Sequence, residues 1–263
     1  MLEQFLFFVV VGFSAQLVDG AIGMAYGVIS SSVLVGFGIS PAVASASVHT
    51  SEIVTTAVSG ISHAMFKNID WELFRRLVLP GILGSVLGAY ILTEIPERWS
   101  RPIIAIYFVV MGFIILYRII NDGRLMQLLQ KIMVKKVHDR LPSMHARGLT
   151  PLGFAGGFLD ATGGGGWGPL VSSTLLAQGA TPHYTIGSVN ATEFLITLSS
   201  SLTFFLTIGI VHWPIILGLI VGGTLAAPFA AYLVRSIQPR IIMLLAGLIV
   251  MLLGFYTLIR LIW

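Results

Sequence analysis

The sequence predicts an all-α integral membrane protein made of two homologous four-segment repeats, with about eight transmembrane segments and a broken or re-entrant first helix in each repeat. Apolar residues make up 56% of the 263-residue chain and charged residues only 10%, whereas about 25% of a soluble domain is charged. Uncharged runs of about 20 residues recur, and each is long enough to cross a hydrocarbon core about 30 Å thick. The chain also repeats itself at a fixed offset.

Eight apolar segments follow one another along the chain. They cover residues 5–36, 42–65, 77–92, 103–120, 152–177, 185–211, 215–234 and 241–262. The third and fourth are short for a membrane span, so we expect that they either tilt little or use flanking residues such as Trp99, Tyr107 and Tyr117 as interfacial anchors. The N-terminus has neither a basic region nor an obvious cleavage site and is interpreted as mature sequence. The absence of cysteine excludes disulfides and thiolate metal sites.

The internal repeat is the strongest signal in the sequence. An offset of 141 positions superimposes aspartates, glutamates, prolines and glycines of the two halves, and apolar composition alone would not align the acids. The matched pairs include Gly12 with Gly153, Phe13 with Phe154, Asp19 with Asp160, Gly23 with Gly164, Pro41 with Pro182, Glu52 with Glu193 and Thr56 with Thr197. An offset of 142 continues the match from Gly81 and Gly223 to Arg118 and Arg260.

The first segment of each half is too long and too rich in glycine to be one plain helix. Residues 5–36 would extend about 48 Å as a helix, and VDGAIG interrupts them, as LDATGGGGWGP interrupts the second copy. If each broken segment crosses the membrane, the repeats are parallel and Lys and Arg divide 11 inside to 4 outside. If it turns back, the repeats are inverted and the division is 12 to 3, which the uncharged connection at 207–213 slightly favours.

A basic stretch separates the two halves. Residues 121–148 and their flanks hold seven of the fifteen Lys and Arg, so the positive-inside rule predicts that they are cytoplasmic. The stretch is either an amphipathic helix on the membrane surface, with Leu125, Leu128 and Ile132 on its apolar face, or a charged linker. We therefore expect a first membrane repeat at 1–120, a cytoplasmic amphipathic linker at 121–148 and a second repeat at 149–263.

Four acids lie inside apolar segments, and they form two repeat-related pairs: Asp19 with Asp160, and Glu52 with Glu193. A carboxylate in a membrane costs about 2.5 kcal/mol or more and by default indicates a functional site. No Lys or Arg lies in the same segments. A polar stripe at helical spacing runs through each glutamate. The stripes are Ser45, His49, Glu52, Thr56, Ser59 and His63 in one half, and Asn190, Glu193, Thr197 and Ser200 in the other.

Each of these features also has a structural interpretation. The aspartates suit caps of the half-helices that follow them, the glutamates suit protonated acids that hydrogen-bond between helices, and the Ser/Thr stripe suits helix packing. His49 and Glu52 have the i, i+3 spacing of a metal pair, but Asn190 replaces the histidine in the other half, so no metal site is expected. GGGGWG lacks the lysine and the strand context of a phosphate-binding loop.

The duplicated pattern G-F-x-x-x-x-x-D-x-x-x-G, followed by small residues, a proline and a polar stretch ending in glutamate, resembles the TauE/SafE sulfite exporter family over essentially the whole chain. The resemblance implies a secondary transporter of small anions, such as sulfite, organosulfonates or related organic acids, often linked to the proton gradient. An anion carrier should present positive potential, whereas the intramembrane charges here are acidic. Broken helices that aim N–H groups at the anion, together with protonated carboxyl groups, would reconcile the two.

The resulting hypothesis assigns roles to thirteen residues. Proton coupling is assigned to Glu52 and Glu193, with His49, since the unperturbed pKa of histidine is about 6.5. Substrate binding is assigned to the glycine-rich breaks and nearby polar side chains: Asp19, Gly20, Gly23, Ser51, Asp160, Gly163, Gly164, Gly165, Asn190 and Thr192. Alternating access would come from one repeat rocking against the other.

Three rival functions remain. A cation transporter or channel would use the intramembrane carboxylates as ligands. A membrane enzyme would need a nucleophile–base pair or a metal cluster, and no such pair repeats, so we expect no enzyme activity and no cofactor. A scaffold would gain nothing evident from duplicated buried acids. The expected partners are a small anionic substrate, protons and membrane lipid, with no nucleic acid; homodimer formation is left open. We expect a multi-pass protein of the inner (plasma) membrane of a prokaryote.

Overall fold

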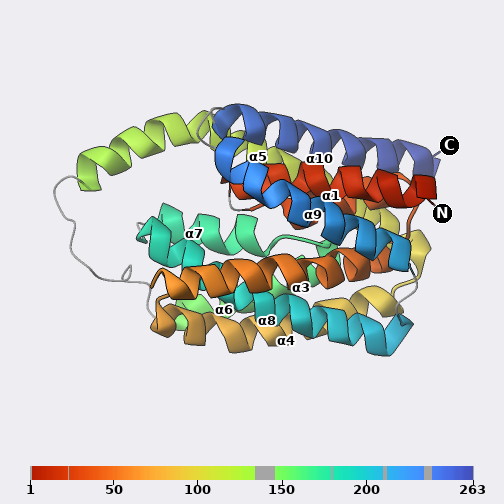
Figure 1. The fold of residues 1–263 in the computed structure, drawn as a ribbon, viewed down its shortest axis with the longest axis horizontal. Coiled ribbons are helices and arrows are strands. Elements are labelled where there is room, and N and C mark those ends of the chain that lie inside the picture. Colours follow the sequence, from red (N-terminus) through yellow and green to blue (C-terminus); the bar gives the residue numbers. More distant parts are fainter. Residues whose placement is uncertain are drawn as a thin grey trace.

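The computed structural model describes residues 2–22, 24–133, 146–178, 180–209, 212–233 and 239–262. Within these, side-chain surroundings are described except at 20–22, 118–133, 146–147, 177, 182–183, 227–233 and 239–242. The described residues are helical throughout, apart from short turns and connections, and contain no strand. Figure 1 shows the helices running side by side, with both chain termini at the same end of the molecule.

Eleven helical elements follow one another in the described residues. They are α1 (Leu2–Ile22), α2 (Tyr26–Gly36), α3 (Pro41–Met65), α4 (Trp71–Glu94), α5 (Glu97–Met133), α6 (Ala146–Gly163), η1 (Gly168–Ser172), α7 (Ser173–Ala177), α8 (Pro182–Ile208), α9 (Trp213–Leu233) and α10 (Pro239–Ile262).

Five of these helices are long and apolar enough to cross a membrane, counting only described residues. The spans are Leu2–Asp19, Trp71–Glu94, Glu97–Tyr117, Tyr184–Ile208 and Met243–Ile262. Tyr26–Gly36 and Trp213–Ala226 are shorter apolar helices. Large apolar side chains are also exposed along the outer faces of the bundle, as a lipid-facing surface requires. The chain is thus an all-helical integral membrane protein, and the number of eight segments stays a prediction.

The chain reverses direction at the first glycine-rich break. Helix α1 ends at Ile22 and α2 begins at Tyr26. The ring of Phe37, which follows α2, lies 4.8 Å from the ring of Phe7 near the start of α1. Helices α1 and α2 therefore form a hairpin whose tip is the VDGAIG break, and the second helix returns toward the end from which the first began.

The second glycine-rich break has the same geometry. Helix α6 ends at Gly163, and η1 and α7 follow after a short connection. Ala180, just beyond α7, packs in the same buried cluster as Leu149 near the start of α6. The backbone is left-handed at Gly164 (φ +68°) and lies in another glycine-favoured region at Gly165 (φ +141°). Residues with a side chain rarely adopt these conformations, which explains a glycine run at this tip.

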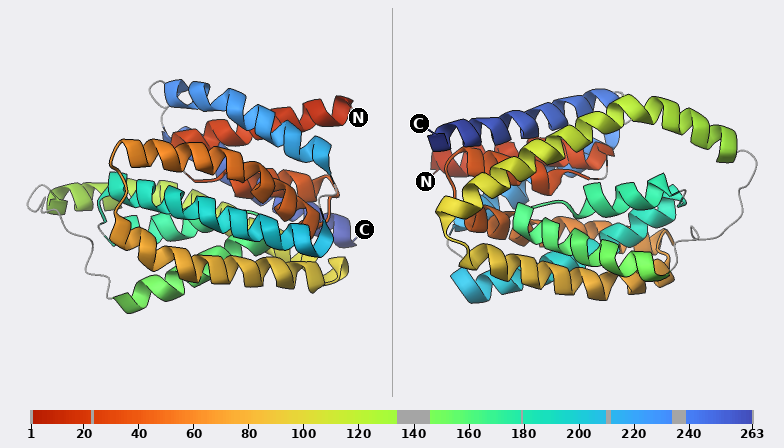
Figure 2. Two further views of the ribbon diagram at one scale, coloured as in Figure 1. Left: turned by 60° about the horizontal axis from the view of Figure 1, so that its bottom comes forward. Right: turned by 180° about the vertical axis from the view of Figure 1, so that it is seen from behind.

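Helix pairing builds the bundle around these two hairpins. Helix α1 packs on α9, α6 packs on α4, α3 packs on α8, and α5 packs on α10. Close crossings use glycine: a methyl group on Gly12 would lie 2.6 Å from the carbonyl oxygen of Leu219, and one on Gly112 would lie 2.7 Å from that of Gly247. Small residues allow this approach between membrane helices. Two further views show the same pairing from other sides (Figure 2).

Helix α5 continues beyond the predicted membrane segment, so residues 121–133 extend it by a stretch that projects past the bundle (Figure 1). The remainder of the predicted linker up to residue 145 lies outside the described residues, and so does the amphipathic pattern of side chains predicted for 121–148.

Local signals explain several of the other helix ends. The Asp70 carboxylate caps α4 by accepting hydrogen bonds from the backbone N–H groups of Glu72 (2.9 Å) and Leu73 (3.1 Å). Pro41 and Pro182 occupy the first turns of α3 and α8.

Candidate functional site

The tips of the two hairpins meet inside the bundle. A methyl group on Gly27, just after the first tip, would lie 2.6 Å from the Cα of Gly165 in the second. A polar cavity of about 240 Å³ opens beside this contact and is bounded by α3 and α8. All four intramembrane acids predicted from the sequence line it: Asp19, Glu52, Asp160 and Glu193.

Asp19 and Asp160 occupy equivalent places in the two hairpins. The Oδ1 atom of Asp19 accepts hydrogen bonds from the backbone N–H groups of Ala25 (2.8 Å) and Tyr26 (3.2 Å). The Oδ1 atom of Asp160 accepts one from the N–H of Trp167 (2.9 Å), which aligns with Tyr26 at the offset of 141. Each aspartate thus satisfies N–H groups at the start of the returning helix, where a negative charge is stabilised. They are both caps and cavity walls.

Glu52 lies between the hairpins and is 5% exposed. Its Oε2 atom has no hydrogen-bond partner among the described residues. Glu193 lines the same cavity from α8. Between the two glutamates, α3 and α8 meet at Thr56 and Thr197, whose hydroxyl oxygens are 3.5 Å apart. A buried carboxylate oxygen without a partner is costly when it is ionised.

No lysine or arginine lines the cavity among the described residues, so its charged walls are acidic. The remaining polar lining includes Gln16, Thr55, Ser59, His63 and Asn190. The described residues also contain no group of three or more histidines and acids placed to hold a metal ion. The cavity is therefore suited to a small polar solute that either carries positive charge or meets neutral carboxyl groups.

His49 lies outside the cavity lining although it is on the same helix as Glu52. Its Nε2 atom is 3.0 Å from the Oδ2 atom of Asp160, and its Nδ1 atom is 2.8 Å from the carbonyl oxygen of Ser45. Both members of the His49–Asp160 pair are at most 2% exposed through their side chains. His49, which the sequence hypothesis assigned to proton coupling together with Glu52, is therefore hydrogen-bonded to Asp160 of the second hairpin.

Hydroxyl groups from three helices hold the tip of the second hairpin. Ser31 donates to the carbonyl oxygen of Gly164 (2.6 Å), Ser45 donates to that of Ala161 (2.6 Å), and Tyr107 donates to that of Gly165. Of the predicted glycines here, Gly165 lines the cavity. Gly164 lies against Ser31, and Gly163 lies against the ring of Tyr107.

The remaining predicted binding residues divide into three cases. Asn190 lines the cavity, with its Nδ2 atom donating to the carbonyl oxygen of Ile186 (2.9 Å). Ser51 and Thr192 are fully buried and donate to backbone carbonyl oxygens of their own helices, so they are outside the lining. Gly23 lies outside the described residues, and for Gly20 only its place in α1 is described.

The lining residues that were not singled out from the sequence include the polar residues Gln16, Tyr26 and Thr55. The Tyr26 hydroxyl lies 3.2 Å from the Oγ of Ser51 and donates to the carbonyl oxygen of Leu219 (3.2 Å). The internal repeat contains a signal for Tyr26, because the offset of 141 pairs it with the aromatic Trp167. Gln16 lies one helical turn before Asp19 on α1, so it shares the face of that acid.

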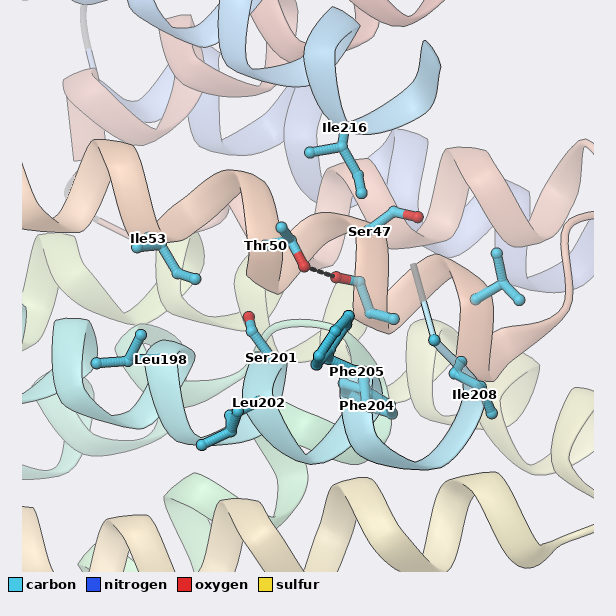
Figure 3. A pocket seen from close by; sticks show the side chains of 13 residues that line it. Ser47, Thr50, Ile53, Leu198, Ser201, Leu202, Phe204, Phe205, Ile208 and Ile216 are labelled. Carbon is cyan, nitrogen blue, oxygen red and sulfur yellow. Dashed lines mark hydrogen bonds between the residues drawn. The ribbon is translucent and has the colours of Figure 1, made fainter. Parts of the chain in front are cut away.

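A second cavity, of about 210 Å³, lies between α3, α8 and α9 (Figure 3). Its walls are mostly apolar and include Leu198, Leu202 and Phe205. The Oγ atom of Ser201, in its wall, has no hydrogen-bond partner among the described residues. The acids are absent from this lining, so the cavity between the hairpins is the candidate site for a polar solute.

Comparison with known proteins identifies the family of the chain. The family model described as sulfite exporter TauE/SafE matches residues 8–257. The chain is 40% identical over 262 residues to the "probable membrane transporter protein YtnM" of Bacillus subtilis (strain 168), an alignment that covers 98% of this chain and 84% of that protein. No solved structure matches the chain. The chain belongs to the sulfite exporter TauE/SafE family of membrane transporters.

Proposed function

We propose that this protein is a secondary transporter that carries a small anion, such as sulfite, an organosulfonate or a related organic acid, together with a proton. The family description names a sulfite exporter, which supports an anionic substrate. The cavity between the hairpin tips, which contains four acids and several hydroxyl and amide groups, is the substrate site in this proposal.

The single observation that carries the proposal is the unpartnered Oε2 atom of Glu52 in the cavity wall. A buried, ionised carboxylate without a partner is strongly disfavoured, and protonation removes most of that cost. Protonation also converts Glu52 into an O–H donor that can bind an anion. The proton and the anion then enter the cavity together, which gives a physical basis for coupled movement. Glu193 on the facing helix has the same role.

The anion would obtain its remaining hydrogen bonds from side chains. The N–H groups of Ala25, Tyr26 and Trp167 are already bonded to Asp19 and Asp160, so the hairpin amides are less free than the sequence hypothesis requires. The lining offers as donors instead the hydroxyl group of Ser59 and the ring of His63 on α3, and the second amide hydrogen of Asn190 on α8. Substrate binding therefore depends on α3 and α8 as much as on the hairpin tips.

The two halves, 1–120 and 149–263, are proposed to be inverted repeats that alternate access to this site, with 121–148 as a cytoplasmic connection. Contacts between repeat-related pairs support a two-fold relation. The approach of Gly12 to Leu219 has its counterpart in that of Gly153 to Leu77. Across α5 and α10, the contact of Gly112 with Gly247 likewise corresponds to that of Gly254 with Ala105. The hairpin geometry of both broken segments supports the inverted arrangement.

The inverted arrangement also gives an orientation. Twelve of the fifteen Lys and Arg then belong to the end of the bundle that holds the α3–α4 connection, and Arg98, Arg101 and Arg260 belong to the other. The positive-inside rule assigns the first end to the cytoplasm of a cell whose plasma membrane holds the protein. His63 is in the last turn of α3 at that end, so the cavity faces the cytoplasm.

A cation transporter is the second candidate. The observation that favours it is the same acidic lining, because four carboxylates without lysine or arginine among the described lining residues attract a cation directly. In that case the unpartnered oxygen of Glu52 is a ligand rather than a proton carrier.

Ligand binding to the purified protein separates the two candidates. The melting temperature is measured at two pH values with sulfite, sulfate, thiosulfate, sulfoacetate, isethionate or acetate, and separately with mono- and divalent cations. Stabilisation by one anion, greater at the lower pH, is the expected result, since bound ligand raises the stability of the folded state. Uptake of that anion into proteoliposomes should then follow an imposed pH gradient. Stabilisation by cations alone would refute anion transport.

A further inference from the structure

Repeat-related residues of α3 and α8 differ in their exposure on the two sides of the polar cavity. His63 and Asn190 line it and are partly exposed. The residues 141 positions from them are Phe204 and His49, which are 1% and 0% exposed. The rings of His49 and Phe204 lie 6.3 Å apart. On one side, His63 and Asn190 therefore face the cavity. On the other side, the residues at the equivalent positions of the repeat, Phe204 and His49, are buried and pack against each other.

Two more repeat-related pairs have the same asymmetry. Ser59 and Ile186 line the cavity and are partly exposed. Their counterparts at the offset of 141, Ser200 and Ser45, are 0% and 1% exposed. Four pairs therefore agree, and in each pair the member near the basic end of the bundle is accessible while the member toward the opposite end is buried.

We propose that His49 and Phe204 form the closed gate on the non-cytoplasmic side of the site, and that Asn190 and His63 form the gate on the cytoplasmic side, which is open in this structure. The proposal rests on the alternating access of the proposed function and names the residues that perform it. His49 and Phe204 are positioning residues here, since they act by blocking the path and not by contacting substrate.

A hydrogen bond between α3 and the second hairpin holds the closed side. The Nε2 atom of His49 lies 3.0 Å from the Oδ2 atom of Asp160. The repeat-related bond would join Asn190 to Asp19, but Asn190 donates to the carbonyl oxygen of Ile186 on its own helix. In the reciprocal state we expect the Asn190–Asp19 bond to form and the His49–Asp160 bond to break. The two bonds then alternate as the two sides open and close.

Space for the gate to open is already present. Interiors are close-packed, so a ring as large as that of Phe204 moves only where there is room. Phe204 forms part of the wall of the apolar cavity of about 210 Å³, beside Ser201 and Phe205 (Figure 3). This cavity gives the ring a volume to enter when the path beside His49 opens. The hydroxyl of Ser201, in the wall of this cavity, has no hydrogen-bond partner among the described residues.

The absence of cysteine from the chain makes the test direct. Single cysteines are introduced by Ser59→Cys and Ser200→Cys, and a membrane-impermeant maleimide is applied to each face of oriented proteoliposomes. Ser59→Cys should react from the cytoplasmic face and Ser200→Cys from neither. Adding Phe204→Ala should raise the labelling of Ser200→Cys from the opposite face by about tenfold or more, because loss of the ring favours the minor open state.

The neighbouring Phe205 provides the matched control, since it is the same residue type and is 53% exposed. Phe205→Ala should leave Ser200→Cys unlabelled. Equal labelling with both alanine variants, or no gain with Phe204→Ala, would refute the gate. If Phe204→Ala does not yield folded protein, His49→Asn is the second test, because asparagine is the residue at the equivalent position of the other repeat. His49→Asn should give the same increase in labelling of Ser200→Cys. The absence of this increase would also refute the gate. Labelling needs no substrate, so failure of anion transport would not change these results.

Discussion

His49 of α3 and Asp160 of α6 are 111 positions apart in the chain, yet the Nε2 and Oδ2 atoms of their side chains are 3.0 Å apart inside the bundle. Asp160 also caps the helix that follows the second hairpin tip, through the N–H of Trp167. One carboxylate therefore joins a gate residue, a hairpin tip and the wall of the polar cavity. Asp19 also caps a helix and lines the cavity, but the hydrogen bonds described for its carboxylate come only from the backbone N–H groups of Ala25 and Tyr26.

This difference predicts that Asp160→Ala is more destabilising than Asp19→Ala. Loss of a cap costs about 0.5–2 kcal/mol in either variant. Asp160→Ala also leaves His49 without its buried partner, which adds a cost of about 1–3 kcal/mol. The melting temperatures of both variants in detergent measure the difference. In a His49→Gln background the two variants should differ less; an unchanged difference would show that the His49–Asp160 bond contributes nothing.

Replacement of the cavity glutamates should abolish or uncouple transport without unfolding the protein. Glu52→Gln and Glu193→Gln keep the size of the side chain but remove the titratable proton that the proposed mechanism moves. Uptake driven by a pH gradient into proteoliposomes should be lost, while expression and melting temperature remain near those of the unchanged chain. Glu97→Gln, at an exposed position on the surface, is the control. Normal transport by both cavity variants at every pH would exclude a proton-carrying role.

Helix crossings at glycine should tolerate a methyl group only where there is room. A Cβ on Gly84 would lie 2.9 Å from the carbonyl carbon of Phe154 and 2.9 Å from the backbone nitrogen of Phe158, so Gly84→Ala should force α4 away from α6. Overpacking of this kind costs about 1–3 kcal/mol. Gly60→Ala is the control, because its nearest contact is 3.5 Å, to the Cα of Ala191. Thermal unfolding should show a large decrease for the first variant and little change for the second.

The pairing of α3 with α8 can be tested by a disulfide. A Cβ placed on Gly60 lies 4.0 Å from the Cβ of Ala191, within the range of about 3.5–4.5 Å found in disulfides. The double variant Gly60→Cys/Ala191→Cys should oxidise spontaneously to an intramolecular bond, detected by mass spectrometry and by loss of free thiols. Gly60→Cys/Ser201→Cys, with the second cysteine toward the opposite end of α8, should stay reduced. Bond formation in the control but not in the double variant would contradict the pairing.

The sequence by itself determined the features that depend on composition and local periodicity. Uncharged apolar runs of about 20 residues indicate membrane helices, because a helix bonds its own backbone groups within the segment when it is surrounded by lipid. The glycine runs around Asp19 and Asp160 lie where the helices break. The four intramembrane acids were identified as a group because the same offset relates them, and all four line one cavity.

Tertiary structure alone decided how those features are used. Whether a broken segment crosses or turns back depends on contacts such as that of Phe7 with Phe37, which no local pattern encodes. His49 could be associated with Glu52 by helical spacing, but its partner is Asp160, which packing brings to it from the other half. Ser59 and Ser200 are the same residue at repeat-related positions, and yet Ser59 lines the cavity and is partly exposed while Ser200 is buried. In the proposed alternating-access mechanism, the two sides differ because the packed bundle adopts one of two discrete arrangements, and this choice is a property of the whole assembly of helices.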